Sequence, residues 1–346
     1  MLRIQKVCLM ISAAAIFTAC KKDKDPIIVL PPSEGAQLQL DGGTGGLNAI
    51  NSVFVDFSSD KATSVARASW DLGFYSGSQF RVKINNTMAA AAVAVNKADI
   101  NAVSIADIDV DTLGNVLANP GGFDVIDDPK TGDITGTVIG EVSATDASNK
   151  VYVLTPVGAT HSTPIDEAKL MKIRILRKGS GYTLQYAKLS ETTFKSLDIT
   201  KDADYNFQYV SLTTGSVVTV EPAKNSWDIQ WTWSMYHTGG GTMPYSFSDL
   251  VFINKLGGVT AAEVLTSTVS YDAYAAANIS ATVFSSNYDV IGAKWRETTG
   301  TIGVKTDRFY VIKDAAGNVY KLRFLNFHAN DGGERGKPKI EYKLVQ

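Results

Sequence analysis

One stretch of the sequence concentrates side chains that could bind a metal or a small molecule. Between Trp231 and Tyr245 the chain places one histidine, two methionines, two tryptophans and two tyrosines around a glycine-rich loop. Imidazole nitrogen and thioether sulfur are donors that transition metals accept, and aromatic rings line apolar ligand slots. The candidate site residues in this stretch are therefore His237, Met235, Met243, Trp233 and Tyr236.

A further methionine, Met88, stands at a corresponding position earlier in the chain. Thr87-Met88 and Thr242-Met243 follow two similar Trp-Asp pairs at nearly matching distances. Met88 with Met243, or His237 with either methionine, could hold a metal ion between or within the two halves of the chain. The alternative is that the methionines fill hydrophobic cores and that His237 is a loop residue.

The familiar catalytic constellations do not show in the sequence. A Ser/His/Asp triad or a hydrolytic metal cluster needs histidine near its partners, and the three histidines, His161, His237 and His328, are far apart along the chain. Gly239–Gly241 lacks the Lys-Ser/Thr and the helix that follow in a phosphate-binding loop. Asp127-Asp128 precedes a proline in a predicted turn and gives weak support for a glycosidase pair. We therefore predict binding rather than catalysis, with His161 and His328 at the surface.

The segments that must position these residues recur in order, which predicts a tandem duplication. Trp70–Phe74 is echoed by Trp227–Trp231, and a predicted hairpin precedes each. Six further echoes follow in the same order: Val95–Lys97 with Ile253–Lys255, Phe123–Ile126 with Tyr288–Ile291, Thr135–Thr137 with Thr299–Thr301, Val151–Leu154 with Phe309–Ile312, Lys172–Ile175 with Lys321–Phe324, and Leu184–Tyr186 with Ile340–Tyr342. We predict two similar modules, at residues 45–195 and 200–346.

Both modules are expected to be β-rich. Lys172–Arg177 and Tyr320–Leu325 alternate polar and apolar residues, as half-buried antiparallel strands do. Ala-rich segments predict short helical inserts at Asp99–Ile108, Thr260–Thr266 and Tyr271–Ala277. The fold class is therefore all-β, with two antiparallel modules and minor helix.

Three further expectations concern burial. Trp70 and Trp227 recur in both modules and are expected to anchor cores, each with its neighbouring aspartate capping a turn. The basic residues of the Lys172 and Lys321 strands are expected on a solvated outer face. Exposed aromatic side chains that could stack on sugar rings are expected at Trp231, Trp233, Trp295 and Tyr236.

The composition excludes two broad classes of function. With 45% hydrophobic and 20% charged residues, the chain can bury a core and is not a disordered tail. The 33 Lys+Arg against 35 Asp+Glu give no basic excess for nucleic-acid binding. A chain of 346 residues exceeds one ordinary domain of about 100–200 residues, in agreement with two modules.

The N-terminus predicts secretion and lipid anchoring. A short cationic start and an apolar run from Val7 to Phe17 are typical of a signal peptide over residues 1–19. Thr18-Ala19-Cys20 resembles a bacterial lipobox, in which Cys20 becomes the acylated first residue of the mature chain. Of the 2 cysteines, Cys8 would leave with the signal, so no thiol remains for a disulfide. Residues 20–44 then form a tether to the membrane, without a spanning helix.

Aromatic-rich strand segments recur in both halves: Trp70–Gly77, Phe80–Val82, Trp227–Ile229, Phe309–Ile312, Tyr320–Phe324 and Pro338–Tyr342. In these segments the chain resembles the HmuY family of Bacteroidetes surface lipoproteins, and the similarity covers most of the chain after about residue 45. The resemblance implies an all-β haem-binding lipoprotein, or haemophore. Such a protein captures haem at the outer membrane or cell surface and passes it to a TonB-dependent outer-membrane receptor for iron acquisition.

Family members differ in the His or Met pairs that hold the iron, so axial ligands are not carried over by motif. On chemical grounds the axial candidates are His237, Met243 and Met88, with Met235, Trp233 and Tyr236 as further haem-contacting candidates. Two alternatives stay open: a surface lipoprotein that binds glycans or another aromatic-stacked ligand, and an adhesive one without haem.

Overall fold

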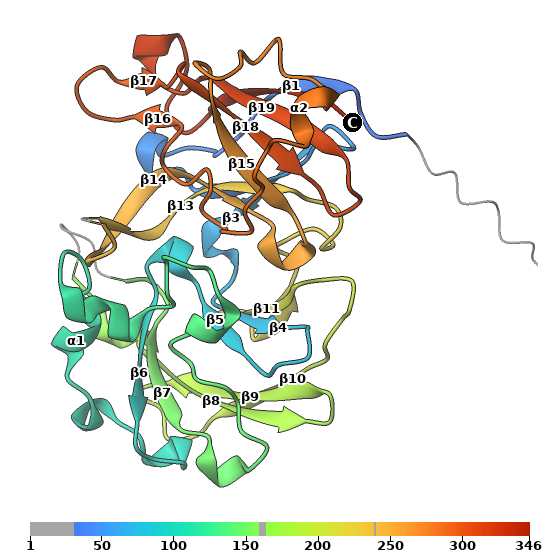
Figure 1. Cartoon of the computed structure of the whole chain (residues 1–346). Helices are drawn as coiled ribbons and strands as arrows, with labels where there is room; N and C mark the ends of the chain where they lie inside the picture. Colours follow the sequence, from blue (N-terminus) through green and yellow to red (C-terminus); the bar gives the residue numbers. More distant parts are fainter. Residues whose placement is uncertain (1–30, 159–163, 239) are drawn as a thin grey trace, which may run out of the picture. The chain divides into compact units, whose positions relative to one another are not determined.

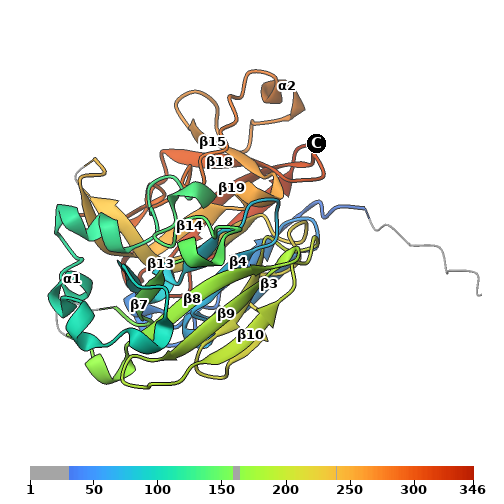
Figure 2. The same ribbon diagram turned by 90° about the horizontal axis from the view of Figure 1, so that it is seen from below.

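Antiparallel sheets account for most of the regular structure in the computed structural model, which describes residues 31–158, 164–238 and 240–346 (Figures 1 and 2). Two of these sheets have five strands and two have four. Among the described residues, helix is confined to α1 (Val110–Gly114), α2 (Ala276–Ile279) and short 3-10 turns. The predicted all-β class with minor helix is confirmed.

One five-stranded and one four-stranded sheet are built from a single continuous stretch of the chain, and we call them sheet pair I. Their strands all lie between Leu72 and Val218. In spatial order the five-stranded sheet is β10 (Lys195–Ile199), β9 (Gly181–Lys188), β8 (Met171–Lys178), β7 (Val151–Thr155) and β6 (Ala91–Val95), and the four-stranded sheet is β12 (Ser216–Val218), β11 (Phe207–Ser211), β4 (Leu72–Tyr75) and β5 (Val82–Ile84).

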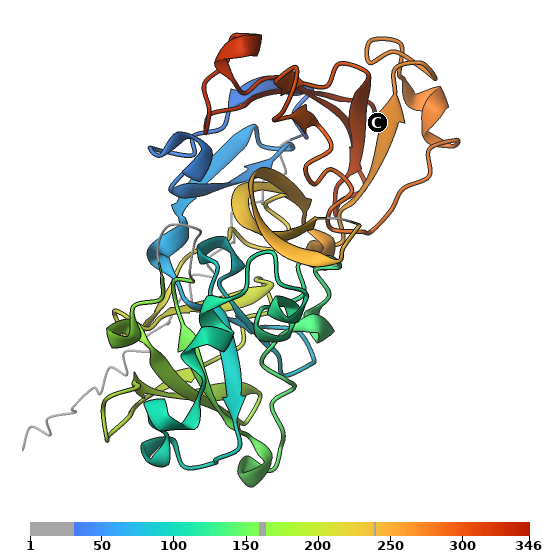
Figure 3. The same cartoon turned by 90° about the vertical axis from the view of Figure 1, so that its left-hand side faces the viewer.

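The other two sheets combine both ends of the chain, and we call them sheet pair II. Figure 3 shows the blue N-terminal strands beside the red C-terminal ones. In spatial order the five-stranded sheet is β1 (Gly35–Gln39), β20 (Lys339–Leu344), β19 (Val319–Asn326), β18 (Arg308–Lys313) and β15 (Thr260–Leu265), and the four-stranded sheet is β14 (Met243–Ile253), β13 (Ile229–Thr238), β2 (Asn51–Asp56) and β3 (Lys61–Ala66). A small ribbon joins β16 (Arg296–Glu297) to β17 (Gly303–Val304).

The hairpin that opens each predicted repeat pairs with the other repeat. β2, followed in sequence by β3, pairs with β13 through Val55↔Ile229. β11, followed by β12, pairs with β4 through Phe207↔Tyr75. The division into modules 45–195 and 200–346 stays a prediction, and the sheets cross its boundary in both directions.

In both halves of the chain, an aspartate hydrogen-bonds to the backbone of the hairpin that comes from the other half. The Asp71 carboxylate accepts a hydrogen bond from the Leu212 backbone N–H at 2.6 Å, and Asp228 accepts one from Phe57 at 2.8 Å. The preceding tryptophans, Trp70 and Trp227, are buried, as predicted. Each Trp-Asp pair therefore stands just before a strand of one half and binds the turn of a hairpin from the other half.

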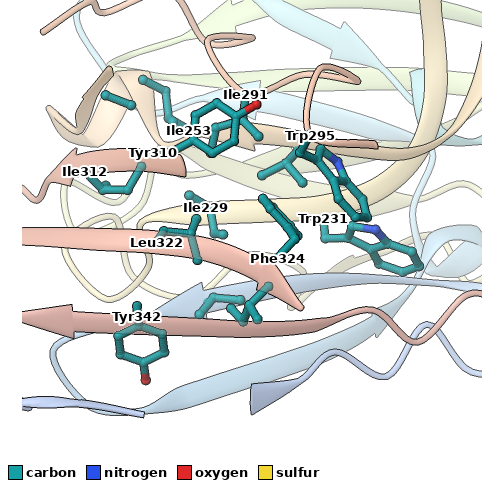
Figure 4. Close-up of a cluster of buried hydrophobic side chains, with 14 of the residues drawn as sticks. Ile229, Trp231, Ile253, Ile291, Trp295, Tyr310, Ile312, Leu322, Phe324 and Tyr342 are labelled. Carbon is teal, nitrogen blue, oxygen red and sulfur yellow. The ribbon is translucent and has the colours of Figure 1, made fainter. Parts of the chain in front are cut away.

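Aromatic residues predicted to be exposed instead fill cores. Trp231 and Trp295 are each 1% exposed in the main core of sheet pair II (Figure 4), and Trp295 stacks on Phe324 with ring centroids 4.0 Å apart. Tyr236 is also buried, and Trp233 is half-buried. The prediction of an exposed aromatic surface is wrong for Trp231, Trp295 and Tyr236. Trp231 and Tyr236 lie on β13 and pack into hydrophobic cores, and Trp295, in the turn before β16, packs into the same core as Trp231.

Two lysines predicted on a solvated face are also buried. Lys172 is 1% exposed and donates to the Val103 carbonyl at 2.9 Å. Lys321 is 7% exposed and donates to the carbonyls of Tyr271 and Tyr274 at 2.7 and 2.8 Å. The prediction failed because inserted segments cover this face of both sheets, and each ammonium binds the insert above it.

The helical inserts are only partly as predicted. Asp99–Ile108 contains two 3-10 turns, and Tyr271–Ala277 reaches only the start of α2. Thr260–Thr266 is not helical, because its residues pair with β18 as strand β15. Sheet pairing therefore overrides the helix preference of this Ala-containing segment.

Replacement of Asp228 by Asn should flatten the dependence of stability on pH. Burial raises the pKa of the Asp228 carboxyl to about 8, with a smaller contribution from Asp56 and Asp314. Because this value exceeds that of the unfolded chain, stability from this group is fully present at low pH and is lost as pH rises towards 8, by up to about 1.4 kcal/mol per unit. Asn keeps an oxygen for the Phe57 N–H but does not ionise.

Urea unfolding at pH 5, 6.5 and 8 measures this effect, and Asp272→Asn, at an exposed site, is the control. The free energy of unfolding should fall less between pH 5 and 8 in D228N than in the unmodified chain. An unchanged pH profile in D228N would contradict the assignment.

Candidate functional site

The β13–β14 hairpin carries most of the predicted ligand candidates. Its register places His237 opposite Pro244 and Thr238 opposite Met243. Opposed residues share a face and successive residues alternate, so His237 and Met243 project to opposite faces of the hairpin. The structure therefore does not bring these two donors together as one axial pair.

A β-bulge sets the direction of the hairpin tip. The register shifts between Thr232 and Ser234, and Asp249 on β14 adopts a positive φ of 57°. Arg335 holds the bulge by donating to the Asp249 carboxylate at 2.9 Å and to the Ser248 hydroxyl at 2.8 Å. Because a bulge bends its strand, this region aims the tip of the hairpin.

The tip docks on sheet pair I through its backbone. The Pro244 carbonyl accepts from the Ala118 N–H at 3.0 Å, and the Gly241 carbonyl accepts from Lys130 Nζ at 3.4 Å. Met243 is 38% exposed at this tip. This residue is therefore partly open to solvent.

His237 is half-buried, with its ring centroid 4.2 Å from that of Tyr236. Burial lowers the pKa of the imidazole, and the charge of Lys130 acts in the same direction, while Asp289 and Asp128 oppose the shift. The ring is therefore mainly neutral at pH 7, the form in which a histidine nitrogen can bind a metal.

Met235 and Tyr236 have structural roles. Met235 is fully buried in a core with residues of β6 and β7. The Tyr236 hydroxyl donates to the Asp289 carboxylate at 2.6 Å, and its ring packs against Phe247. Neither side chain offers a free donor to a ligand.

Met88 and Trp233 meet at an arginine that sequence reasoning did not identify. The Arg67 guanidinium lies 4.9 Å above the Trp233 ring, and one of its nitrogens is 3.8 Å from Met88 Sδ. Arg67 also donates to the carbonyls of Ala49 and Thr87, and burial lowers its pKa to about 10. Arg67 thus ties the two sheet pairs together and engages the Met88 sulfur.

The predicted pairing of Met88 with Met243 is not preformed. Met88 and Trp233 both contact Arg67, whereas Met243 is opposite Thr238, five residues beyond Trp233 on β13. Five strand residues span about 17 Å. In the parts of the chain that the structure describes, no cluster of three or more His, Cys, Asp or Glu residues could hold a metal ion.

A cavity of about 200 Å³ lies between the four-stranded sheets of the two pairs, and none of the six candidate residues lines it. Aromatic, amide, hydroxyl and charged side chains share the lining. They include Phe54, Trp70, Lys83, Asp127, Tyr209, Glu221, Trp227, Gln230, Ser234 and Tyr288. Ligand pockets for drug-sized molecules are roughly 300–1,000 Å³, so this cavity is too small for haem.

A hydrogen-bonded chain of titratable groups borders the cavity. Lys83 Nζ donates to the Tyr209 hydroxyl at 2.9 Å, and Tyr209 donates to Glu221 at 3.1 Å. Burial lowers the pKa of Lys83 and raises that of Glu221. Asp127 accepts from the Ile84 and Val138 N–H groups, and burial raises its pKa to about 7.

The remaining predicted residues lie elsewhere. His328 begins a 3-10 turn, where its Nδ1 accepts from the Asn330 N–H at 3.2 Å. His161 and Cys20 fall outside the described residues. Within the described part of the chain, the helices are too short or too polar to cross a membrane.

Comparison with known proteins gives one match. A family model described as HmuY protein matches residues 48–342. Searches of the curated proteins and of the solved structures find no match. The matched range includes both sheet pairs except β1 and the last residues of β20.

Replacement of Arg67 by Ala should weaken the junction between the sheet pairs. The variant leaves the Ala49 and Thr87 carbonyls without their donor, so we expect a loss of about 2–3 kcal/mol in the free energy of unfolding. Urea unfolding measures the loss. Lys178→Ala, which removes an exposed contact to Asp198, is the control and should cost about 1 kcal/mol or less. Equal losses in both variants would contradict the role of Arg67.

Proposed function

Because the chain belongs to the HmuY family, we propose that it is a haem-binding surface lipoprotein that captures haem for iron acquisition. The family match over residues 48–342 is the observation that carries this proposal. A binding role rather than catalysis also agrees with the sparse histidines. The proposed partner after capture is a TonB-dependent receptor of the outer membrane.

His237 is the donor that best fits haem iron among the six candidates. Its imidazole is mainly neutral, half-exposed and on the face of the hairpin away from Met243. Met235 is buried in a core, and the Met88 sulfur faces the Arg67 cation. We therefore assign His237 as the axial ligand that the β13–β14 hairpin contributes. Bound haem would supply the iron for this bond, while the hairpin holds the ring in place.

The glycan-binding alternative loses its original support. Three of the four aromatic side chains proposed to stack on sugar at the surface are buried in cores. An extended glycan therefore lacks the exposed aromatic platform on which that alternative depended.

Titration of the purified chain with haemin tests the haem proposal. We expect a shifted Soret band in the unmodified chain and an affinity at least about tenfold weaker in His237→Ala. The control His328→Ala should bind as the unmodified chain does. Because Met243 lies on the opposite face and Met88 faces Arg67, Met243→Leu and Met88→Leu should keep the same Soret position.

Absence of a spectral change in the unmodified chain would refute haem binding. A Soret shift altered by Met243→Leu but not by His237→Ala would instead move the axial ligand to the other face of the hairpin.

The proposed location at the outer membrane or cell surface depends on acylation of Cys20. In cells, Cys20→Ala should move most of the chain from the membrane fraction to a soluble fraction, because the acyl chains are the proposed anchor. Cys8→Ala, within the signal, should leave the distribution unchanged. Immunoblots of the two fractions measure this, and membrane retention of the Cys20 variant would contradict the lipid anchor.

A further inference from the structure

The cavity between the sheet pairs has a polar floor provided by β13. Gln230, Thr232 and Ser234 alternate with aromatic and apolar residues along this strand and all line the cavity. Alternate residues share one face of a strand. A covered strand face is ordinarily apolar, so a polar stripe here indicates a polar neighbour inside the cavity.

Two groups of this floor have unused hydrogen-bonding capacity. Thr232 is engaged, because its hydroxyl bonds to Ser52 at 2.7 Å and to the Trp233 carbonyl at 2.8 Å. Ser234 is 5% exposed, and its hydroxyl has no hydrogen-bond partner among the described residues. The Gln230 side-chain amide also has none within the described ranges. Two fully buried atoms of the cavity lining, Trp227 Nε1 and Asn86 Oδ1, also have no hydrogen-bond partner among the described residues. A buried polar atom without a partner is uncommon and calls for one.

The walls of the cavity are mainly aromatic. Trp227 and Phe54 from sheet pair II meet edge to face at 5.1 Å, and Trp70 and Tyr209 from sheet pair I do so at 4.8 Å. Rings beside amide and hydroxyl groups suit a molecule with both apolar C–H surface and several hydroxyl groups.

The charged groups beside the cavity already have partners within the protein. The Lys83 ammonium donates to Tyr209 and lies 3.9 Å from the centre of the Phe207 ring, with Glu221 and Asp127 as opposing charges. Arg67 donates to backbone carbonyls. Since the unpartnered groups of the floor are neutral, they favour a neutral ligand over an ion.

A strap formed by residues 127–137 limits the size of a ligand. The Tyr288 hydroxyl donates to the Pro129 carbonyl at 2.5 Å, and Lys255 donates to that of Thr131 at 3.4 Å. Gly132, at a φ of 56°, lies so close to the Tyr288 ring that a Cβ would be 2.6 Å from it. The cavity of about 200 Å³ therefore suits a small molecule.

We propose that this cavity binds a small neutral polyol of monosaccharide size, with Gln230 and Ser234 as its hydrogen-bonding floor and Trp70 and Trp227 as its walls. The site is separate from the haem site proposed at the hairpin tip. The strap narrows the space, so the proposed ligand is a single sugar ring rather than a chain.

Saturation-transfer NMR on the purified full chain, with D-glucose, D-galactose and N-acetyl-D-glucosamine as separate probes, tests the proposal. At least one probe should receive saturation, and calorimetry then gives its affinity. Gln230→Ala and Ser234→Val should each weaken that affinity by roughly fivefold or more, the latter because Val removes the hydroxyl and keeps the volume.

Gln185→Ala on β9 is the matched control, because Gln185 lies outside the cavity lining. It should bind the probe as the unmodified chain does, and thermal unfolding should show that every variant is folded. The proposal is overturned if none of the three probes receives saturation, which would mean a cavity filled by water, or if Gln230→Ala binds like Gln185→Ala. Haemin titration of Gln230→Ala should be unchanged, so failure of the polyol site and failure of haem binding give different results.

Discussion

The exchange of hairpins between the two halves of the chain is the constraint from which the rest of the structure follows. β2 and β3 belong by sequence to the first half, yet β2 pairs with β13, while β11 returns to pair with β4. β1 likewise pairs with β20 along its whole length. Sheet pair II is therefore complete only when both ends of the chain are present, and closing it costs the entropy of bringing distant segments together. Anchoring contacts that offset this cost occur at matching places in both halves.

Those anchoring contacts correspond residue by residue. Asn85 donates to the carbonyls of Arg67 and Trp70, and Asn254 donates to those of Lys224 and Trp227. The buried lysines of β8 and β19 each hold an insert by its carbonyls. A duplication would produce this repetition of polar contacts, because each contact satisfies the same buried backbone groups in both halves. The duplication itself stays a prediction from the sequence.

The sequence predicts the burial of a side chain where the local pattern of residues decides it. It does not predict burial where a segment distant in sequence covers the side chain. The recurrence of Trp70 and Trp227 correctly predicted buried anchors. Alternation around Lys172 revealed two faces of a strand, but it carries no information about an insert that later covers the polar one. The role of Arg67 was not predicted, because its main hydrogen-bond acceptors are backbone carbonyls, which have no sequence signature.

The separation of His237 from Met243 has the same origin. Both residues lie in one aromatic stretch, and proximity in sequence suggested a shared site. The register of β13 and β14 then places them on opposite faces, and a shift of one residue would have placed them together. That register follows from the turn and the bulge. The bulge residue Asp249 has a positive φ and accepts a hydrogen bond from Arg335, which lies far along the chain.

The bulge also lies between the two sites proposed on β13. Ser234, at the end of the cavity floor, and His237, near the tip, are three residues or about 10 Å apart along β13. The register shift lies next to Ser234, and the Arg335 contacts hold the bulge on the opposing strand independently of whatever fills the cavity. A ligand on the floor therefore contacts the strand before the tip begins, while the direction of the tip is set by side chains outside the cavity. His237 lies outside the lining of the cavity, so the two sites proposed on β13 do not share this residue.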